Sequence, residues 1–280
     1  APRHFEAIRA NGGELVAVCD VSDSVGIIDR YNQNALYFKE VERFDRYLDK
    51  LKRSNPIDFL VVCTPNYLHD SHIRIGLRNG CDVICEKPLV GNARNIEALL
   101  EIEKETGRKV YSILQLRLHE QILTIQKELE GRTSSKVKLE YITSRGKWYD
   151  YSWKGDIEKS GGILLNIGIH FFDVLVFIFG EPLGINSKTY SDRSASGIIR
   201  FQNATVDWHL SIDKADLPIN HFPTYRLFSF DEYEIEFSEG FTELHNKSYE
   251  EILKGNGFGL AEAKKSIELV NKLQFENGIK

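Results

Sequence analysis

The sequence predicts an α/β protein in which a doubly wound parallel sheet is followed by an α+β part with a mostly antiparallel open sheet. As far as residue 115, short apolar runs alternate with helical segments, and this alternation is typical of βαβ units. Beyond it, longer segments alternate apolar and polar residues, which indicates half-buried antiparallel strands. A chain of 280 residues can build two cores of ordinary size.

The first domain is expected at residues 1–115. Its strands and helices follow one another with short turns between them. Parallel neighbours need a crossover helix, so helices should cover both faces of this sheet. The expected strands are 15–20, 57–63, 83–85 and 109–114, and the expected helices are 5–11, 44–52, 69–79 and 92–105.

The second domain is expected at residues 116–280. It begins with a helix at 118–129 and ends with an amphipathic helix at 259–273. We find no internal repeat, low-complexity tract or long linker, so the two domains should pack closely. The strands expected between the helices are 136–143, 195–201, 205–212, 225–229 and 232–237.

The start of the first domain is unusual for a parallel sheet. The helix expected at 5–11 has no strand before it, and the chain contains no Met. The strand at 15–20 nevertheless needs a neighbour in the sheet. We therefore expect that a first strand and the loop after it are absent from this sequence.

Composition excludes several classes of protein. Lys and Arg number 36 against 41 Asp and Glu, for a net charge of -5, and no basic run tracks a phosphate backbone, which argues against nucleic acid and anionic membranes as partners. We find no apolar stretch that approaches the roughly 20 residues of a membrane span, and no signal peptide, so we expect a cytoplasmic protein with a small-molecule ligand. We expect the four cysteines to be small core residues that bind no metal and form no disulfide. They are Cys19, Cys63, Cys81 and Cys85.

Glu86-Lys87-Pro88 is the most informative motif. It follows the apolar run 81–85 and so places a Lys where a buried strand ends at the edge of the sheet. A Lys there can exchange a proton with a substrate hydroxyl if its surroundings hold its pKa near the working pH. The alternative is a solvated charge at a strand end.

Polar residues also follow two other strands of the first domain. Asp20 can accept both hydrogen bonds of an adenosine ribose and repel a 2′-phosphate, which favours NAD over NADP, although Asp is also common as a turn cap. The segment 64–69 lies at the carboxyl edge of the sheet, where open α/β folds bind ligands, and Asn66 is also expected to cap the next helix. The phosphate-binding glycine loop G-x-G-x-x-G is not present in the sequence.

A second motif lies in the apolar segment 161–173. Asn166, His170 and Asp173 are spaced for one helix face, and the Gly161-Gly162 pair permits close backbone approach. An imidazole can pass a proton near neutral pH while a carboxylate fixes its tautomer; the alternative is a satisfied core histidine. The preceding segments 145–149 and 153–156 mix cations with aromatic rings, which suits a diphosphate and a flat ring or simply a solvated loop.

Together these motifs resemble the Gfo/Idh/MocA oxidoreductase family, and the resemblance covers nearly the whole chain. Further segments resemble its WlbA/WbpB branch, for example Cys63-Thr64-Pro65-Asn66-Tyr67-Leu68-His69-Asp70 and Ser152-Trp153-Lys154-Gly155-Asp156. The resemblance implies a Rossmann dinucleotide-binding domain followed by a substrate and oligomerisation domain. It also implies NAD-dependent oxidation of the C3 hydroxyl of UDP-N-acetyl-glucosaminuronic acid, for bacterial surface polysaccharide.

The resemblance also implies site residues. Lys87 and His170 would be the acid/base pair, in roles that remain open, and Asn166 would hold substrate or water where many family members have Asp. Weaker candidates for the uronate or UDP are Arg145, Tyr151 and Arg226. Positions that match the family near NAD are Asp20, Ser24, Thr64, Pro65, Asn66, His69, Glu86, Lys87, Gln115 and Trp153.

The resemblance further implies a homotetramer and, in some members of the branch, reoxidation of NADH by 2-oxoglutarate. Two other functions stay open at this point. One is a dehydrogenase of the same family that acts on another sugar or inositol. The other is an NAD-binding regulator without catalysis, which would be expected to lack Lys87 and His170.

Overall fold

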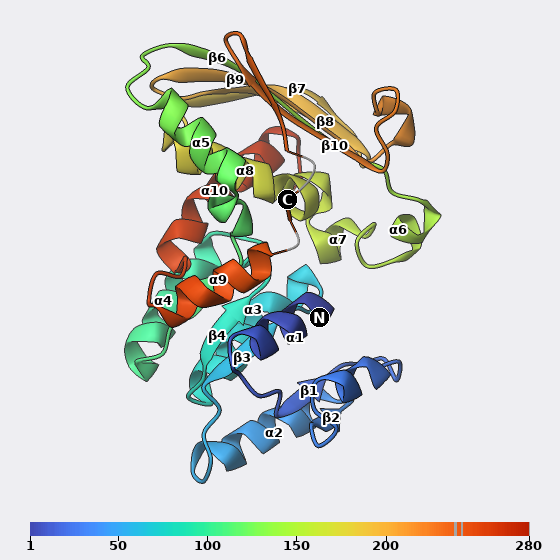
Figure 1. The fold of residues 1–280 in the computed structure, drawn as a ribbon, viewed down its shortest axis with the longest axis vertical. Helices are drawn as coiled ribbons and strands as arrows, with labels where there is room; N and C mark the ends of the chain where they lie inside the picture. Colours follow the sequence, from blue (N-terminus) through green and yellow to red (C-terminus); the bar gives the residue numbers. More distant parts are fainter. Residues whose placement is uncertain (238–239, 242, 280) are drawn as a thin grey trace.

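In the computed structural model, which describes residues 1–237, 240–241 and 243–279, parallel strands and helices alternate through the first part of the chain (Figure 1). Its strands are β1 (Ala17–Cys19), β2 (Leu36–Phe38), β3 (Phe59–Val62), β4 (Asp82–Cys85) and β5 (Val110–Ser112). Its helices are α1 (Pro2–Ala10), α2 (Val41–Lys52), α3 (His69–Arg78) and α4 (Arg94–Thr106), with short turns η1 (Gly26–Arg30) and η2 (Asn66–Leu68). All of its strand pairs are parallel, as predicted.

The parallel strands form two separate sheets rather than one. β1 pairs with β2, and β3, β4 and β5 form a second sheet. Within the described residues no strand lies between β1 and β3. A cavity of about 390 Å³ lies there instead, and apolar side chains such as Val16, Val18 and Val61 line it.

The second part is built on a six-stranded sheet whose order is β11-β10-β6-β9-β8-β7. Its strands are β6 (Ser135–Thr143), β7 (Gly184–Tyr190), β8 (Ser194–Arg200), β9 (Ala204–Ser211), β10 (Thr224–Phe230) and β11 (Tyr233–Glu236). β6 and β9 are parallel and every other neighbour in the sheet is antiparallel. The prediction of a mostly antiparallel sheet is therefore confirmed, and the α/β class with it.

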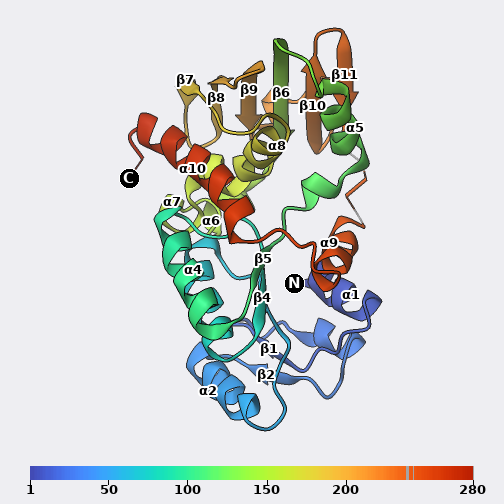
Figure 2. The ribbon, with the colours of Figure 1, turned by 90° about the vertical axis from the view of Figure 1, so that its left-hand side faces the viewer.

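Helices separate this sheet from the first part of the chain (Figures 1 and 2). The helices are α5 (Glu120–Leu129), α6 (Lys147–Tyr151), α7 (Ile157–Ser160), α8 (Ile169–Phe179), α9 (Leu244–Leu253) and α10 (Leu260–Glu276), with turns η3 (Gln115–Leu118), η4 (Leu164–Gly168) and η5 (Lys214–Asp216). α8 lies under the sheet and is buried along most of its length. α9, although late in the sequence, lies beside α1 of the first part. The boundary expected near residue 115 stays a prediction.

The expectation that no apolar stretch reaches the length of a membrane span was wrong. Helical residues Ile157–Phe179, 23 in number, are long and apolar enough by composition, with a mean hydropathy of 2.1. The stretch is not evident in the sequence because the polar residues Asn166, His170 and Asp173 interrupt its apolar residues. Since 78% of its apolar window is buried inside the molecule, its position is that of a core helix.

The four cysteines do not all behave as core residues. Cys81 and Cys85 are buried, Cys19 is partly buried, and Cys63 at the end of β3 is exposed. All four are free thiols. The expectation of a small core residue was therefore wrong for Cys63, because it lies past the last paired residue of its strand.

Candidate active site

Lys87 reaches from the end of β4 to the second part of the chain. Its Nζ donates a hydrogen bond to the backbone oxygen of Asn166 at 2.9 Å. Asn166 lies in the π-helical turn η4, directly before α8, and such turns occur frequently at functional sites. His170 follows Asn166 by one helical turn, so the ammonium of Lys87 lies at the end of the helix that carries His170.

Burial and neighbouring charges set the ionisation of these two residues. Burial is the largest of the effects that together lower the pKa of Lys87 to about 8; Glu86 opposes it, and the charges of Lys154 and Arg145 act in the same direction as burial. Burial and the charge of Lys87 hold the pKa of His170 well below its ordinary value. At neutral pH, His170 is therefore a neutral imidazole, and Lys87 is the group that titrates near the working pH.

Asn166 is fixed by contacts on three sides. Besides accepting from Lys87, it donates from Nδ2 to the hydroxyl of Tyr149 at 3.0 Å. Its Oδ1 lies 3.4 Å from the Nδ2 of Asn66, which also donates to the backbone oxygen of Ser160 at 2.8 Å. Asn66 does not cap α3, contrary to expectation, since no side chain caps that helix. Its amide instead joins the two parts of the chain.

Asp173 does not belong to this site. Its carboxylate receives two hydrogen bonds from Arg117, at 2.9 and 2.7 Å, in a buried pair. The expectation that it fixes the tautomer of His170 was wrong, because Arg117, 56 positions away in the chain, takes both oxygens of the carboxylate although His170 and Asp173 lie in the same helix α8. Among the described residues, no hydrogen bond holds the His170 ring.

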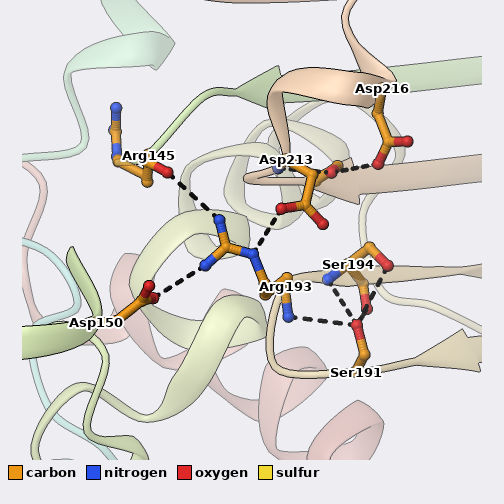
Figure 3. A network of polar contacts seen from close by, with 8 residues as sticks. Arg145, Asp150, Ser191, Arg193, Ser194, Asp213 and Asp216 are labelled. Atoms are coloured by element: carbon orange, nitrogen blue, oxygen red, sulfur yellow. Dashed lines mark hydrogen bonds and ion pairs between the residues drawn. The ribbon is translucent and has the colours of Figure 1, made fainter. Parts of the chain in front are cut away.

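A polar network holds the segment that includes α6 (Figure 3). Arg193 donates to Asp213 at 2.5 Å, to Asp150 of α6 at 2.9 Å and to the backbone oxygen of Arg145 at 3.3 Å. It therefore ties the ends of β8 and β9 to the chain on both sides of Gly146. This leaves the guanidinium of Arg145 close enough to Lys87 and Lys154 to lower the pKa of both.

The other residues that the sequence indicated in the second part differ in how close they lie to Lys87 and His170. The ammonium of Lys154 lies 5.5 and 5.6 Å from the ring centres of Trp148 and Trp153. The guanidinium of Arg226 lies 4.2 Å from the ring centre of Phe241 and adds to the positive charge at His170. Tyr151 is 87% exposed, and no described contact brings it to the site.

Residues predicted near NAD lie at the carboxyl ends of the first-part strands. Asp20, Ser24 and Thr64 line one cavity, although the Asp20 carboxylate also caps a turn by accepting from the Ser22 amide at 2.8 Å. Pro65 begins η2. Gln115, after β5, is buried with its Oε1 unpartnered.

That orphaned amide oxygen and the exposed carboxylate at the end of β1 suit the amide and ribose hydroxyls of a nicotinamide dinucleotide. The residues present therefore fit NAD. His69 fits less well. Its two ring nitrogens lie 2.7 and 2.8 Å from the backbone oxygens of Pro88 and Thr64, so it holds the turn after β4.

Glu86 is enclosed by histidines that the sequence did not single out. Its Oε1 lies 3.0 Å from Nε2 of His4 and 3.1 Å from Nε2 of His245, and its Oε2 accepts from the Lys87 amide at 3.2 Å. Burial alone raises the pKa of Glu86, but the hydrogen bonds from His245 and His4 outweigh it and hold the pKa well below its ordinary value. Tyr149 and Lys154 lie in the segments 145–149 and 153–156 that the sequence indicated, although neither was named as a site residue. Nothing in the sequence pointed to His245.

Comparison with known proteins places these observations in a family. Residues 1–113 match the NAD-binding Rossmann fold of the Gfo/Idh/MocA oxidoreductase family, and residues 133–209 match the C-terminal α/β domain of that family. Inositol 2-dehydrogenase of Rhizobium meliloti is 30% identical over 51% of this chain and 43% of its own length. D-glucoside 3-dehydrogenase of Escherichia coli is 27% identical over 61% and 48%. The chain thus spans a little under half the length of the curated relatives it matches.

Solved structures match over almost the whole chain. The WlbA (WbpB) dehydrogenase of Thermus thermophilus, in complex with NAD and UDP-GlcNAcA, is 42% identical with a TM-score of 0.95, over 98% of this chain and 91% of that one. The WlbA dehydrogenase of Bordetella pertussis, at 19% identity and a TM-score of 0.77 over 99% and 93%, shares the fold. With these matches and both domain matches, the chain belongs to the Gfo/Idh/MocA oxidoreductase family.

Proposed function

We propose that this protein oxidises the C3 hydroxyl of UDP-N-acetyl-glucosaminuronic acid to the 3-keto sugar with NAD, in bacterial surface polysaccharide biosynthesis. One observation carries the proposal. The Lys87 ammonium lies on the helix turn before His170, in a chain that is 42% identical over nearly its full length to a dehydrogenase solved with NAD and UDP-GlcNAcA.

The ionisation of the two residues supports a division of roles. With a pKa of about 8, Lys87 exists in both forms near the working pH, which is what a proton-transfer group requires. The neutral amine takes the proton of the C3 hydroxyl as hydride leaves C3. When bound, NAD supplies the hydride acceptor. His170, neutral and unengaged, orients the hydroxyl by a hydrogen bond rather than acting as the base.

The charge of the site supports an acidic substrate. The chain as a whole is negative, at -5, yet the residues that perturb Lys87 and His170 include the cations Lys154, Arg145 and Arg226. The nearby carboxylate of Glu86 is occupied by two histidines. A site of this kind attracts a uronate carboxylate or a diphosphate. Arg145 and Arg226 are the proposed anion ligands, whereas the exposure of Tyr151 weakens its candidacy.

The residues that would hold NAD follow from their places at the sheet edge. Asp20 and Ser24 would receive the adenosine ribose, and Thr64 to Asn66 the middle of the dinucleotide. Gln115 and Trp153 would lie toward the nicotinamide end, with Glu86 and Lys87 beside it. His69 would support the turn rather than touch the cofactor.

A second candidate is oxidation of a free cyclitol or glucoside. The identity of 30% with inositol 2-dehydrogenase over half of the chain favours it. The cation cluster argues against it, because a neutral polyol offers that cluster no counter-charge. A regulator without catalysis is disfavoured because Lys87 and His170 are both present.

Further properties belong to the same proposal. 2-oxoglutarate is proposed as the reoxidant of NADH, because a second structure of the Thermus thermophilus dehydrogenase contains NAD and α-ketoglutarate. A homotetramer and a cytoplasmic location are proposed on the family resemblance, with no nucleic acid or membrane as partner.

A substrate panel tests the proposal. Purified protein is incubated with NAD and UDP-GlcNAcA, UDP-GlcNAc, free N-acetylglucosamine or myo-inositol, and NADH absorbance and product mass are followed. We expect turnover of UDP-GlcNAcA with a product two hydrogens lighter, and turnover at least tenfold weaker without the carboxylate. Turnover of inositol but not of UDP-GlcNAcA would replace the proposal with the second candidate.

A further inference from the structure

The cluster around Glu86 joins three segments that are far apart in the sequence. His4 comes from α1, Glu86 from the end of β4 and His245 from α9. The two imidazole rings stand edge to face, with centres 5.1 Å apart. Both histidines are almost fully buried, at 2% and 3% exposure. Glu86 is therefore held by groups that surrounding helices fix in place.

The donor and the acceptor of each hydrogen bond in the cluster follow from the charge of Glu86. An ionised carboxylate only accepts, so both imidazoles donate from Nε2 to Oε1 of Glu86. The Nδ1 of His4 then accepts from the Tyr249 hydroxyl at 2.9 Å. This chain requires the Nε2–H tautomer of a neutral His4, and burial, which lowers the pKa of His4, favours the neutral form.

The cluster has a consequence for Lys87. Among the described residues, no ion pair joins the Lys87 ammonium to Glu86, although the two residues are neighbours in the chain. The carboxylate is turned to the histidines, and the ammonium is turned to the backbone oxygen of Asn166. The carboxylate thus accepts a hydrogen bond from the Lys87 amide, and its negative charge is kept near the Lys87 ammonium without an ion pair between the two.

We propose that the His4–Glu86–His245 cluster is a positioning device, which supplies negative charge to Lys87 while keeping the Glu86 carboxylate from pairing with its ammonium. The arrangement of the cluster is independent of the proposed function, and only the use of the Lys87 proton in catalysis rests on that function. Without the histidines, Glu86 could turn toward Lys87 and hold its proton. Without the carboxylate, the cations Lys154 and Arg145 would act on Lys87 unopposed. Among the described residues, the charged and titratable groups that interact with Glu86 or Lys87 are His4, His69, His170, His245, Cys63, Cys85, Tyr249, Arg145 and Lys154.

Two variants test the device because they should act in opposite directions. Glu86→Gln keeps an acceptor oxygen for both imidazoles but removes the charge, so the titration midpoint of Lys87 should fall by roughly one pH unit. His245→Leu removes one donor and frees Glu86, so the midpoint should rise. His245→Gln, whose side-chain amide can still donate, should restore the wild-type value.

The midpoint is read without substrate, by NMR titration of protein labelled with ¹³C at lysine Cε, with the Lys87 signal assigned by its loss in Lys87→Arg. Glu236→Gln is the control. Glu236 lies in β11 of the second part, with its carboxylate 3.6 Å from another histidine, His221. Its Lys87 midpoint should stay unchanged. Shifts of the same sign in Glu86→Gln and His245→Leu, or no shift in either, would overturn the proposal. If Glu86→Gln does not fold, the two His245 variants decide alone.

The pH profile of kcat/KM provides the functional reading. For the wild-type protein and both variants its midpoint should follow the NMR midpoint. If UDP-GlcNAcA is not turned over at all, the proposed function fails while the NMR result still decides the role of the cluster. Moved NMR midpoints with an unmoved kcat/KM midpoint would show that the cluster does not serve catalysis through Lys87.

Discussion

Lys87 is partly buried, yet it lies close to two other cations, and the one described hydrogen bond of its ammonium goes to a backbone oxygen. A lysine used only for stability would instead be expected to pair with a carboxylate or extend into water. Its position is therefore suited to proton transfer, provided that it can lose its proton near the working pH. Two predictions follow from its surroundings.

Replacing Lys87 by Ala should lower kcat/KM for UDP-GlcNAcA by about 10²- to 10⁴-fold, the usual contribution of a positioned acid or base. NAD affinity, measured by isothermal titration, should change little. Lys188→Ala is the matched control, because that lysine pairs with Asp207 on the exposed sheet. Wild-type turnover in Lys87→Ala would remove Lys87 from the mechanism.

The pH dependence should follow the same residue. Because the neutral amine is the reactive form and the pKa of Lys87 is about 8, kcat/KM should level off above that pH and fall about tenfold for each unit below it. Lys154→Met should move the midpoint upward, because Lys154 lowers the pKa of Lys87. Lys147→Met, in the same segment but without a described contact to Lys87, should leave it in place. A downward move in Lys154→Met would contradict the electrostatic picture.

At this scale the sequence was informative about individual residues and uninformative about their partners. Lys87 and Asn166 could be singled out because their local motifs are distinctive. The role of Asp173 could not be predicted, because its partner Arg117 lies 56 positions away in the chain. His245 carried no local signal for the same reason, since only the packing of α9 against α1 brings it to Glu86.

The element that positions Asn166 is η4, and Gly161 and Gly162 precede it with positive φ angles of 77° and 70°. Space around Gly161 is also restricted, because an added Cβ would lie 2.3 Å from a methyl carbon of Leu165. The start of the site helix therefore depends on backbone conformations and clearances that a larger residue does not tolerate.

Gly161→Ala should lower the free energy of unfolding by about 2–4 kcal/mol, the sum of left-handed strain and overpacking. Gly12→Ala is the control, since Gly12 has a φ of 75° with nothing within 4 Å of the added Cβ; it should cost about 1 kcal/mol. Urea unfolding measures both. Equal costs would mean that the contact with Leu165 relaxes freely.

The segment containing α6 should depend on the Arg193 network in a different way. Arg193→Met should raise KM for UDP-GlcNAcA several-fold, because Arg145 and Tyr149 lose their fixed backbone. It should change the free energy of unfolding by only about 1 kcal/mol, as is usual for partly exposed ion pairs. Lys188→Met removes an exposed ion pair of the same sheet as the control. A large loss of stability with unchanged KM would show that the network supports the fold and not the site.

The elements themselves were predictable where hydrophobic periodicity was strong. Helices α3 and α10 and strands β6 and β9 begin and end within a few residues of expectation. β7 was missed because it is an edge strand with few buried residues and a register shift near Ser187. The π-helical geometry of η4 could not be foreseen, because apolar residues on every side give no periodicity to read.

At the scale of the whole molecule, the buried pair of Arg117 and Asp173 ties the turn at which the second part begins to α8, the core helix of that part. Arg117 lies in η3, where the chain passes from one part to the other, and it also donates to the backbone oxygen of Glu262 in α10 at 3.2 Å. Removing one partner leaves an uncompensated buried charge.

Arg117→Met should therefore lower the free energy of unfolding by about 3–5 kcal/mol. The double variant Arg117→Met, Asp173→Leu should recover much of that loss, because no buried charge remains unpaired. Lys104→Met, which breaks an exposed pair with Glu101, should cost less than about 1 kcal/mol. A double variant no more stable than the single one would show that packing around Arg117, not its charge, provides the stability.

The overall architecture was predictable because the two halves have different hydrophobic patterns. The lack of a strand between β1 and β3 agrees with the expectation from the sequence that a strand beside residues 15–20 is absent. The position of α9 on the first half was not predictable, because it depends on contacts between distant segments, which periodicity does not encode.

The position of α9 has a consequence for how the protein matures. His245 follows Glu86 by 159 residues and reaches it only through the packing of α9 against α1. Glu86 therefore gains its second imidazole only in a chain that has been made as far as α9 and has folded that helix into place.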